Sequence, residues 1–464
     1  MKKLLLFLLV LVSTSSIIAQ DLSGKWSGQI NIQGIRIWVT FNIENSDNGY
    51  NATMDISDQG VKDIPVKITV KNPALTFTIP TAGISYEGVL KDSIIVGTFN
   101  QNNQDFPLNL SKQQIEEKVN LRPQEPTLPY PYNSENVFFE NIEADITLAG
   151  TLTYPKDEGI FPVVVLISGS GPQNRDEELM GHKPFLVLSD YLTRNGIAVL
   201  RFDDRGVGES DGDFNSATTA DFATDVESAI TYLKTRKEID KNNIGLIGHS
   251  EGGLIAPMVA AASIDVDFIV LMAGSGIRGD SLLLLQQNLI EKALGTSDAE
   301  IMDILHLNSN IFEIIENAEN DKDLDLQLRA MMNKALEGEF TAIIPEEMTK
   351  EEFIASQFNL FTSPWVKYFL RYDPSKTLEK VQCPVLAING EKDLQVPPKE
   401  NLAAIKNALE KGNNSRVTTR EYKDLNHLFQ ESDTGSPLEY SIIDQTIAPI
   451  VLKEVTEWIS LQLK

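Results

Sequence analysis

Two hydrophobic patterns divide the chain. Between residues 21 and 112, apolar and polar residues alternate with a period of two, most clearly in GQINIQGIRIWVTFNIE and PVKITV. Turns rich in Asn and Gly, such as SDNG at residues 46–49, interrupt the alternation. This pattern is typical of half-buried strands joined by tight turns, so it predicts a small all-β domain, either a barrel or a sandwich.

From residue 134 onward, short continuous apolar runs alternate with segments of helical spacing. PVVVLIS, IAVLRFD, NIGLIG and DFIVLMAG are candidate strands, and KPFLVLSDYLTRNG and DFATDVESAITYLKTRKEI are candidate amphipathic helices. Strands that are buried on both faces lose the period of two. The pattern therefore predicts an α/β fold, with a parallel sheet between helices and a site at the carboxyl ends of the strands.

This α/β pattern is interrupted once. Residues 277–380 contain four segments with helical spacing and no strand pattern, and CPVLAINGEKD then resumes the sheet. We therefore predict an α/β core from residues 134–276 and 381–464, with a helical cap inserted between the two parts. The polar and then proline-rich residues 113–133 are expected to form a stiff linker.

Residues 1–20 have the features of a secretory signal. Lys2 and Lys3 precede an apolar run from Leu4 to Val12, and small residues follow up to Ala19. The apolar run is too short for a permanent membrane-spanning helix, and no cysteine lies near the cleavage region. The sequence thus predicts an exported protein, periplasmic or secreted, without a stable membrane span.

Composition narrows the possible partners. The 464 residues carry a formal net charge of −26, and a nucleic-acid partner is not expected because phosphates would need a basic face. The single cysteine, Cys383, excludes an internal disulfide. Since Cys383 begins the apolar run CPVLAI, we expect it to act as a small core side chain.

The candidate nucleophile lies between a predicted strand and a predicted helix. Asn243 to Ser263 reads NIGLIGHSEGGLIAPMVAAAS and contains the pattern G-x-S-x-G around Ser250. A serine hydroxyl is a weak nucleophile, so it must be exposed on a sharp turn beside a base. The same pattern around Ser210 lies between two loops, and we therefore interpret Ser210 as a loop residue.

A serine nucleophile needs a basic histidine, and the chain has four. His182 falls in a predicted loop, and His306 lies in a helical segment of the insert, where it is expected to pack. His249 adjoins the nucleophile, so its side chain is expected to point away from the site. His427 follows the strand RVTTREYKD and precedes the last helix, and position and elimination therefore favour it as the base.

The histidine needs an orienting carboxylate, for which Asp393 is the candidate. Asp393 follows the strand CPVLAING and precedes VPP, which opens a helix, so it stands at the same edge of the sheet as Ser250. Glu391 and Asp424 are alternatives nearby in sequence. The resulting chain order is Ser250, Asp393, His427.

Two backbone N–H groups must stabilise the oxyanion of acyl transfer. Glu251, directly after the nucleophile, supplies one candidate. The other should come from the loop SGSGP at residues 168–172, where we favour Ser170 and keep Gly169 as an alternative. A dinucleotide-binding loop is disfavoured because the spacing is not G-x-G-x-x-G and a proline follows.

These motifs together resemble the α/β-hydrolase superfamily over residues 134–464. The matching pieces are LAGTLTYP, SGSGPQNRDE, DDRGVGES, GHSEGG, GEKDLQVPP and NHLF, and they are most similar to bacterial carboxylesterases with a GSGP oxyanion loop, grouped with serine aminopeptidase-like and lysophospholipase-like hydrolases. The resemblance implies a serine esterase that acts on a small-molecule ester without a cofactor. Asn174 stands where that group has aspartate, and Asp203 and Arg205 are expected to brace loops.

The N-terminal segment carries one further resemblance. Its opening, Gly24-Lys25-Trp26, resembles the G-x-W start of lipocalin-like β-meanders, in which the tryptophan closes a small barrel. This implies an accessory domain, with Trp26 in its core.

Two other functions remain open from the sequence. An exopeptidase on the same three residues would need cap carboxylates, such as Glu313, Glu316 or Glu346, to hold a substrate amine. An exported binding protein would hold its ligand in the β-domain beside an inert hydrolase domain. Haloalkane chemistry is disfavoured because it would require aspartate at position 250.

Overall fold

The chain forms two compact units, which divide after Glu116. The computed structural model describes residues 21–32, 35–46, 49–56, 61–71, 73–79, 83–91, 93–101, 104–112, 122–337 and 349–463. The predicted signal at residues 1–20, the first part of the predicted linker and residue 346 of the predicted cap lie outside this range. Within it, no helix is long and apolar enough to cross a membrane.

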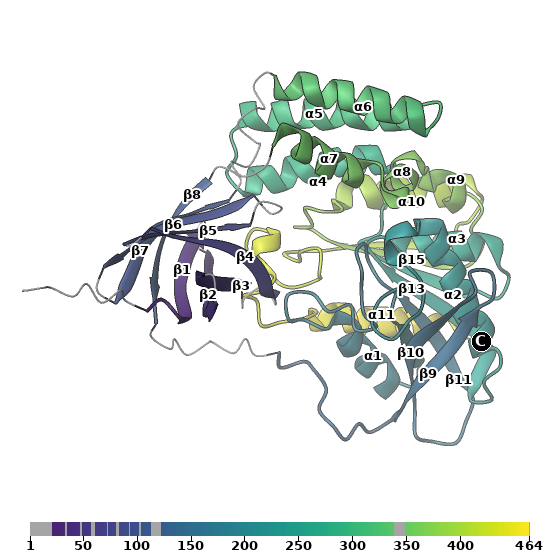
Figure 1. Cartoon of the computed structure of the whole chain (residues 1–464). Coiled ribbons are helices and arrows are strands. Elements are labelled where there is room, and N and C mark those ends of the chain that lie inside the picture. Colours follow the sequence, from purple (N-terminus) through teal and green to yellow (C-terminus); the bar gives the residue numbers. More distant parts are fainter. Residues whose placement is uncertain are drawn as a thin grey trace, which may run out of the picture. The chain divides into compact units, whose positions relative to one another are not determined.

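The described residues of the N-terminal unit form a closed antiparallel barrel (Figure 1). Its strands are β1 (Gly24–Ile32), β2 (Ile35–Ser46), β3 (Gly49–Ile56), β4 (Val61–Lys71), β5 (Ala74–Ile79), β6 (Ile84–Lys91), β7 (Ile94–Gln101) and β8 (Gln104–Ser111). Each strand pairs with the next, and β1 closes the barrel against β8. Closure leaves no free sheet edge, and the period of two places alternate side chains inside.

Aromatic side chains fill the barrel interior. The rings of Phe41 and Phe77 stack with centroids 4.1 Å apart, and Tyr86 packs against both. The Tyr86 hydroxyl donates to a backbone carbonyl of β7 or β8. Gly97 makes room for this ring, since a Cβ there would lie 2.6 Å from it. Trp26 is buried, as the sequence predicts, and its indole N–H donates to the Leu22 carbonyl.

The second unit is built on an eight-stranded sheet with the order β16-β15-β14-β13-β11-β12-β10-β9. The strands are β9 (Asn133–Asn141), β10 (Ile146–Tyr154), β11 (Phe161–Ile167), β12 (Ala198–Phe202), β13 (Ile239–His249), β14 (Phe268–Met272), β15 (Val385–Gly390) and β16 (Val417–Tyr422). β9 and β10 form an antiparallel hairpin, and β10 also pairs antiparallel with β12. The remaining neighbours are parallel, so their carboxyl ends share one edge.

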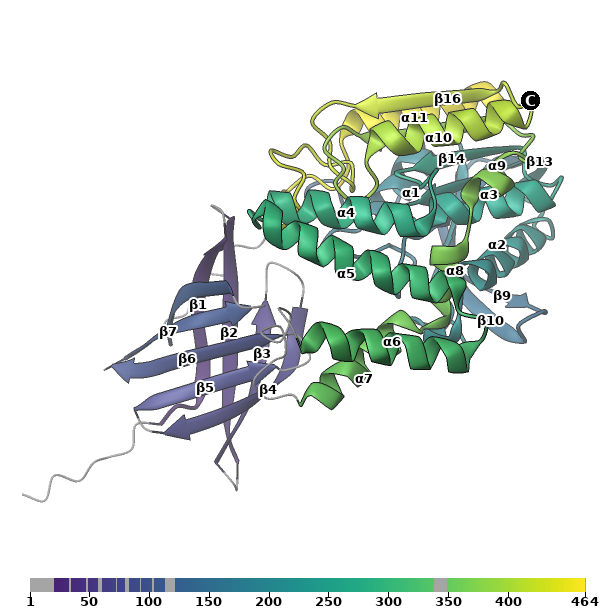
Figure 2. The same cartoon turned by 90° about the horizontal axis from the view of Figure 1, so that it is seen from above.

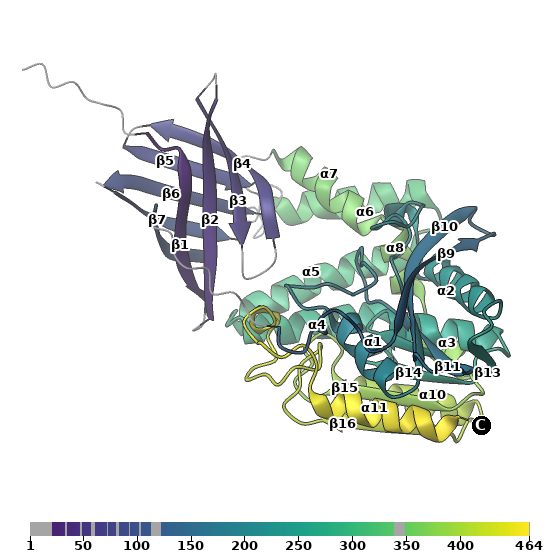
Figure 3. The same ribbon diagram turned by 90° about the horizontal axis from the view of Figure 1, so that it is seen from below.

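Helices cover both faces of this sheet (Figure 3). One face carries α1 (Pro184–Arg194) and α11 (Pro449–Gln462), and the other carries α2 (Thr219–Leu233), α3 (Gly252–Ala262) and α10 (Pro398–Lys411). Along β11, Val163 and Val165 enter the core under α2 and α3, whereas Val164 and Leu166 enter the core under α1 and α11. This alternation explains why PVVVLIS is continuously apolar.

In chain order, a helical insert lies between β14 and β15, and Figure 2 shows its helices in green. Its described helices are α4 (Gly279–Ala293), α5 (Asp298–Asn317), α6 (Asp321–Leu336), α7 (Lys350–Phe361), α8 (Pro364–Arg371) and α9 (Pro374–Leu378). Reciprocal caps begin two of them, Ser297 with Glu300 at α5 and Thr349 with Glu352 at α7. The prediction that His306 packs is wrong, because its side chain is exposed on α5.

We expect the Tyr86→Ala substitution to destabilise the barrel by about 3 kcal/mol or more, because it opens a cavity among buried rings. The measurement is urea unfolding of the full chain, followed by near-ultraviolet circular dichroism. Glu87→Ala, which changes an exposed neighbour on β6, is the control. Equal unfolding free energies for the two variants would contradict a barrel packed around Tyr86.

Candidate active site

Ser250 occupies a strained turn between β13 and α3. Its φ of 53° lies in the left-handed region, which residues other than glycine rarely adopt. The Ser250 N–H donates to the Met272 carbonyl at 2.9 Å, so the neighbouring strand β14 holds the turn in place. Strain that the surrounding structure maintains is characteristic of functional positions.

The two glycines of the motif permit a close backbone approach. A Cβ at Gly248 would lie 1.9 Å from the carbonyl oxygen of Gly252, and a Cβ at Gly252 would lie 2.2 Å from that of Ile167. Any larger residue would therefore separate β13, α3 and the end of β11. This explains why the pattern around Ser250 begins and ends with glycine.

Asp393 and His427 form a buried pair. Asp393 Oδ2 lies 2.8 Å from His427 Nδ1, and the two residues are 2% and 4% exposed. The other carboxylate oxygen of Asp393 accepts from the N–H groups of Gln395 and Val396, both at 2.8 Å. The carboxylate is therefore fixed by its own loop and orients the imidazole, with the Nε2 atom directed away from it.

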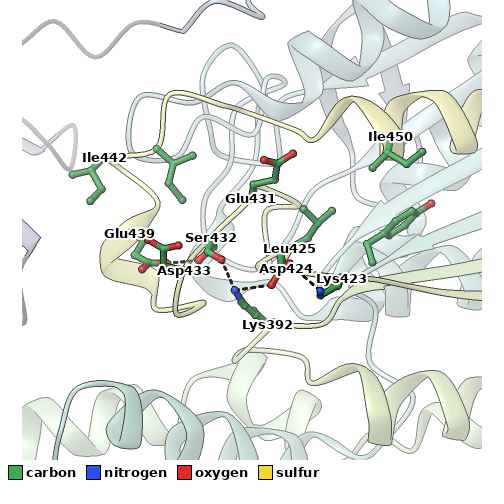
Figure 4. Close-up of a pocket in the computed structure, with 12 residues that line it drawn as sticks. Lys392, Lys423, Asp424, Leu425, Glu431, Ser432, Asp433, Glu439, Ile442 and Ile450 are labelled. Atoms are coloured by element: carbon green, nitrogen blue, oxygen red, sulfur yellow. Dashed lines mark hydrogen bonds and ion pairs between the residues drawn. The ribbon is translucent and has the colours of Figure 1, made fainter.

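The two alternative acids do not contact His427. Asp424 pairs with Lys392 at 2.9 Å, and Glu391 accepts the Asp424 N–H. A depression of about 870 Å³ is lined by residues that include Asp424, Lys392 and Ser432, and Figure 4 shows the contact between Asp424 and Lys392. Within the described residues, the Ser250 hydroxyl makes no hydrogen bond, and contacts of this kind are often long in free enzymes.

The candidate oxyanion donors differ in availability. The Gly169 N–H donates to Glu177 Oε1 at 2.7 Å, so it is already engaged. A Cβ on Gly169 would lie 3.2 Å from the Ser250 Cβ, which places this loop directly against the nucleophile. No described residue accepts from the N–H groups of Ser170 or Glu251. Ser170 is therefore the better candidate in this loop.

The Glu251 side chain has contacts that the sequence did not indicate. Glu251 is 5% exposed, and its carboxylate accepts from Thr219 Oγ1 at 2.6 Å and from Trp365 Nε1 at 2.7 Å. Burial raises the pKa of the Glu251 carboxyl. Since Thr219 begins α2 and Trp365 belongs to α8, the residue after Ser250 connects the turn to the insert. The sequence indicates a role only for its backbone N–H.

His249 also differs from the sequence interpretation. Its ring does not point out of the site but lies beside His427, with ring centroids 4.9 Å apart. The reason is that the Glu177 loop and the His427 loop both pack over the end of β13 and enclose the last side chain of the strand. Sequence reasoning missed a role for Glu177, although it ends the matching piece SGSGPQNRDE, because nothing in that motif shows that its carboxylate meets His249.

The braces predicted near this edge are present. Arg175 forms an ion pair with Asp203 at 2.6 Å, and Arg205 pairs with Asp225 at 2.7 Å. Ser210 donates to the Asp203 carbonyl and is a loop residue, as its context predicts.

Asn174 has a local structural role. Its side-chain oxygen accepts from the N–H groups of Asp176 at 3.0 Å and Glu178 at 3.3 Å. An aspartate could accept the same two bonds, so the asparagine preserves the turn.

Comparisons with known proteins place this arrangement in context. The sequence profile of a family described as alpha/beta hydrolase fold matches residues 162–434, more than half of the chain, including Ser250, Asp393 and His427. Esterase EstD from Thermotoga maritima is 27% identical over 326 residues, which are 68% of this chain and 67% of EstD.

Two further matches each cover more than half of the chain. A 31.7 kDa protein from the traX-finO intergenic region of Escherichia coli is 27% identical over 273 residues, 58% of this chain and 83% of that protein. Among solved structures, the esterase Pf2001 of Pyrococcus furiosus is 14% identical, with a TM-score of 0.44 over 72% of this chain and 92% of Pf2001.

A buried carboxyl beside the oxyanion loop makes stability depend on pH. Burial raises the pKa of Asp204 from 3.8 to about 8, although it accepts hydrogen bonds from Ser168 and from the Gln173 N–H. Because the pKa of Asp204 is higher in the folded than in the unfolded state, the folded state keeps this proton at pH values where the unfolded state has lost it. Protonation of Asp204 therefore stabilises the folded state at low pH, and this stabilisation is lost as pH rises from about 4 to 8.

Relative to Asp204→Asn, the wild type should therefore lose about 2 kcal/mol or more of unfolding free energy across this range. Urea unfolding of both proteins at pH 5, 7 and 8.5 measures the difference. A difference that is constant with pH would contradict a protonated Asp204.

Proposed function

The chain belongs to the alpha/beta hydrolase fold family, as the sequence resemblance predicted, and we propose that it hydrolyses carboxylic esters with Ser250, His427 and Asp393. One observation carries the proposal: the buried Asp393–His427 pair stands at the same sheet edge as a serine held at a φ of 53°. The name of the matched relative, esterase EstD, supports hydrolysis of an ester.

The geometry assigns the roles in the first half of the reaction. Asp393 accepts from Nδ1–H of His427, so the neutral imidazole has its lone pair on Nε2. His427 Nε2 then takes the Ser250 proton as the hydroxyl oxygen attacks the acyl carbon. Asp393 holds the imidazole in this tautomer and stabilises the imidazolium that forms.

The collapse of the tetrahedral intermediate completes the cycle. His427 gives its proton to the leaving alcohol, and an acyl-enzyme remains on Ser250. A water molecule activated by His427 releases the acid. The N–H groups of Ser170 and Glu251 stabilise the oxyanion in both halves, helped by the positive N-terminal end of α3.

The cap carboxylates considered for an exopeptidase give that alternative no support. An exopeptidase would need an unpaired cap carboxylate near the site, but Glu316 pairs with Arg278. Glu313 is exposed on α5, and Glu346 lies outside the described residues.

We further propose that residues 1–20 direct export, so that the enzyme acts on small esters in the periplasm or outside the cell.

Ser250→Ala should abolish hydrolysis of p-nitrophenyl butyrate, since no nucleophile remains. The same substitution should remove labelling by a fluorophosphonate probe, as detected by mass spectrometry. Ser210→Ala, the second serine with the same flanking pattern, is the control and should keep both signals. Retained hydrolysis in Ser250→Ala would overturn the assignment.

Asp393→Asn should lower kcat by about 10⁴-fold, because an amide in that position favours the wrong imidazole tautomer. Asp424→Asn should leave kcat unchanged, since Asp424 pairs with Lys392 and not with His427. Steady-state rates on the same ester distinguish the two acids, and the reverse order of effects would make Asp424 the orienting residue.

A further inference from the structure

The buried ring of His249 has hydrogen-bond acceptors at both nitrogens. Nδ1 lies 2.9 Å from Glu177 Oε1, and Nε2 lies 3.1 Å from the backbone oxygen of His427. A neutral imidazole donates from one nitrogen only, whereas an imidazolium donates from both. With a carboxylate at Glu177, both contacts are therefore hydrogen bonds only when His249 is positively charged.

His182 shows the opposite arrangement in the same unit. Its Nδ1 faces the Thr446 hydroxyl at 2.9 Å, which can donate as well as accept. Its Nε2 faces the Tyr440 carbonyl at 2.8 Å and the Gln430 side-chain amide at 3.0 Å. A neutral ring therefore finds a suitable partner at each nitrogen in either tautomer. Burial accordingly lowers the pKa of His182 to about 4.

The charged groups around His249 reverse the effect of burial. Burial alone would lower the pKa of His249, but the Glu177 charge, its hydrogen bond, the His427 carbonyl and the Asp393 charge together raise it. The remaining described side chains in the small cavity beside the ring are apolar. They come from α1, β14 and the segments after His427: Pro184, Phe185, Leu188, Met272, Leu428, Phe429 and Ile447.

The contact between Glu177 and His249 joins three loops at the carboxyl edge of the sheet. Glu177 Oε1 accepts the Gly169 N–H at 2.7 Å as well as His249 Nδ1. The first contact fixes the loop after β11, which lies against Ser250. Through Nε2, His249 fixes the backbone of His427 after β16.

We propose that Glu177 and His249 are positioning residues, whose buried ion pair holds the oxyanion loop and the His427 loop around Ser250. This role rests on the proposed esterase function. Engagement of the Gly169 N–H sets the orientation of that loop, and donation to the His427 carbonyl sets the distance between the base and the nucleophile. Deprotonation of His249 removes one of its two hydrogen bonds and loosens the arrangement.

The protonation state of His249 can be measured without any activity. Nitrogen NMR of the full chain with ¹⁵N-labelled histidine, assigned with His249→Gln and His182→Gln, should show two protonated nitrogens on His249 at pH 7. His182 should show one. A neutral His249 at pH 7 would overturn the proposal.

Kinetics test the positioning role. Glu177→Gln should lower kcat for p-nitrophenyl butyrate by about 10- to 100-fold with a smaller change in KM, as expected when catalytic groups are displaced by fractions of an ångström. Because the lost carboxylate no longer favours the imidazolium, the alkaline limb of the kcat/KM profile should move to lower pH. Glu178→Gln, an exposed neighbour, should change neither value.

The outcomes separate this proposal from the proposed function. If the wild type neither hydrolyses the ester nor reacts with a fluorophosphonate, the esterase function fails, and the catalytic role of the pair fails with it. If the wild type is active and the alkaline limb of kcat/KM lies at the same pH in Glu177→Gln as in the wild type, the pair only supports folding. In that case the positioning role alone is overturned.

Discussion

The close backbone approach between β13 and α3 is the constraint on which the site depends. With no side chain at Gly248 or Gly252, strand, helix and the end of β11 meet at van der Waals distance. The unfavourable φ of Ser250 persists because β14 holds its N–H and the sheet core is packed on both faces. The turn is therefore maintained by tertiary packing and not by local propensity.

Burial of polar groups around this turn follows from the same geometry. Parallel strands bring the loops after β11, β13, β15 and β16 to one edge, where Glu177, His249, Asp393 and His427 are all less than a tenth exposed. Buried polar atoms without partners are costly, but here each side chain finds its partner on a different loop. The hydrogen bonds that satisfy these groups also fix the loops relative to one another.

Much of this arrangement could be predicted from local sequence pattern. Ser250 was identified by the strand and helix on either side of it, and His427 and Asp393 by their positions after predicted strands. The barrel followed from a period of two, and the continuous apolar runs from strands buried on both faces. These signals lie within about ten residues of each position.

The contacts that sequence reasoning missed join residues far apart in the chain. Glu177 and His249 are 72 residues apart, and Glu251 and Trp365 are 114 residues apart. No period or motif links such pairs, because they meet only after the sheet is assembled. His306 was misplaced for a related reason, since helical spacing does not reveal which face of α5 meets the core of the insert.

The bond between Glu251 and Trp365 limits how freely the insert can be exchanged. Inserts of this kind are natural targets for transplantation between related enzymes when a new substrate range is wanted. In this chain, a transplanted insert would have to place a hydrogen-bond donor where the Trp365 indole N–H lies. Without such a donor, the buried carboxyl of Glu251, next to the nucleophile, would lose one of its hydrogen bonds. The insert and the turn at Ser250 would therefore have to be exchanged together, although Glu251 and Trp365 are more than a hundred residues apart in the sequence.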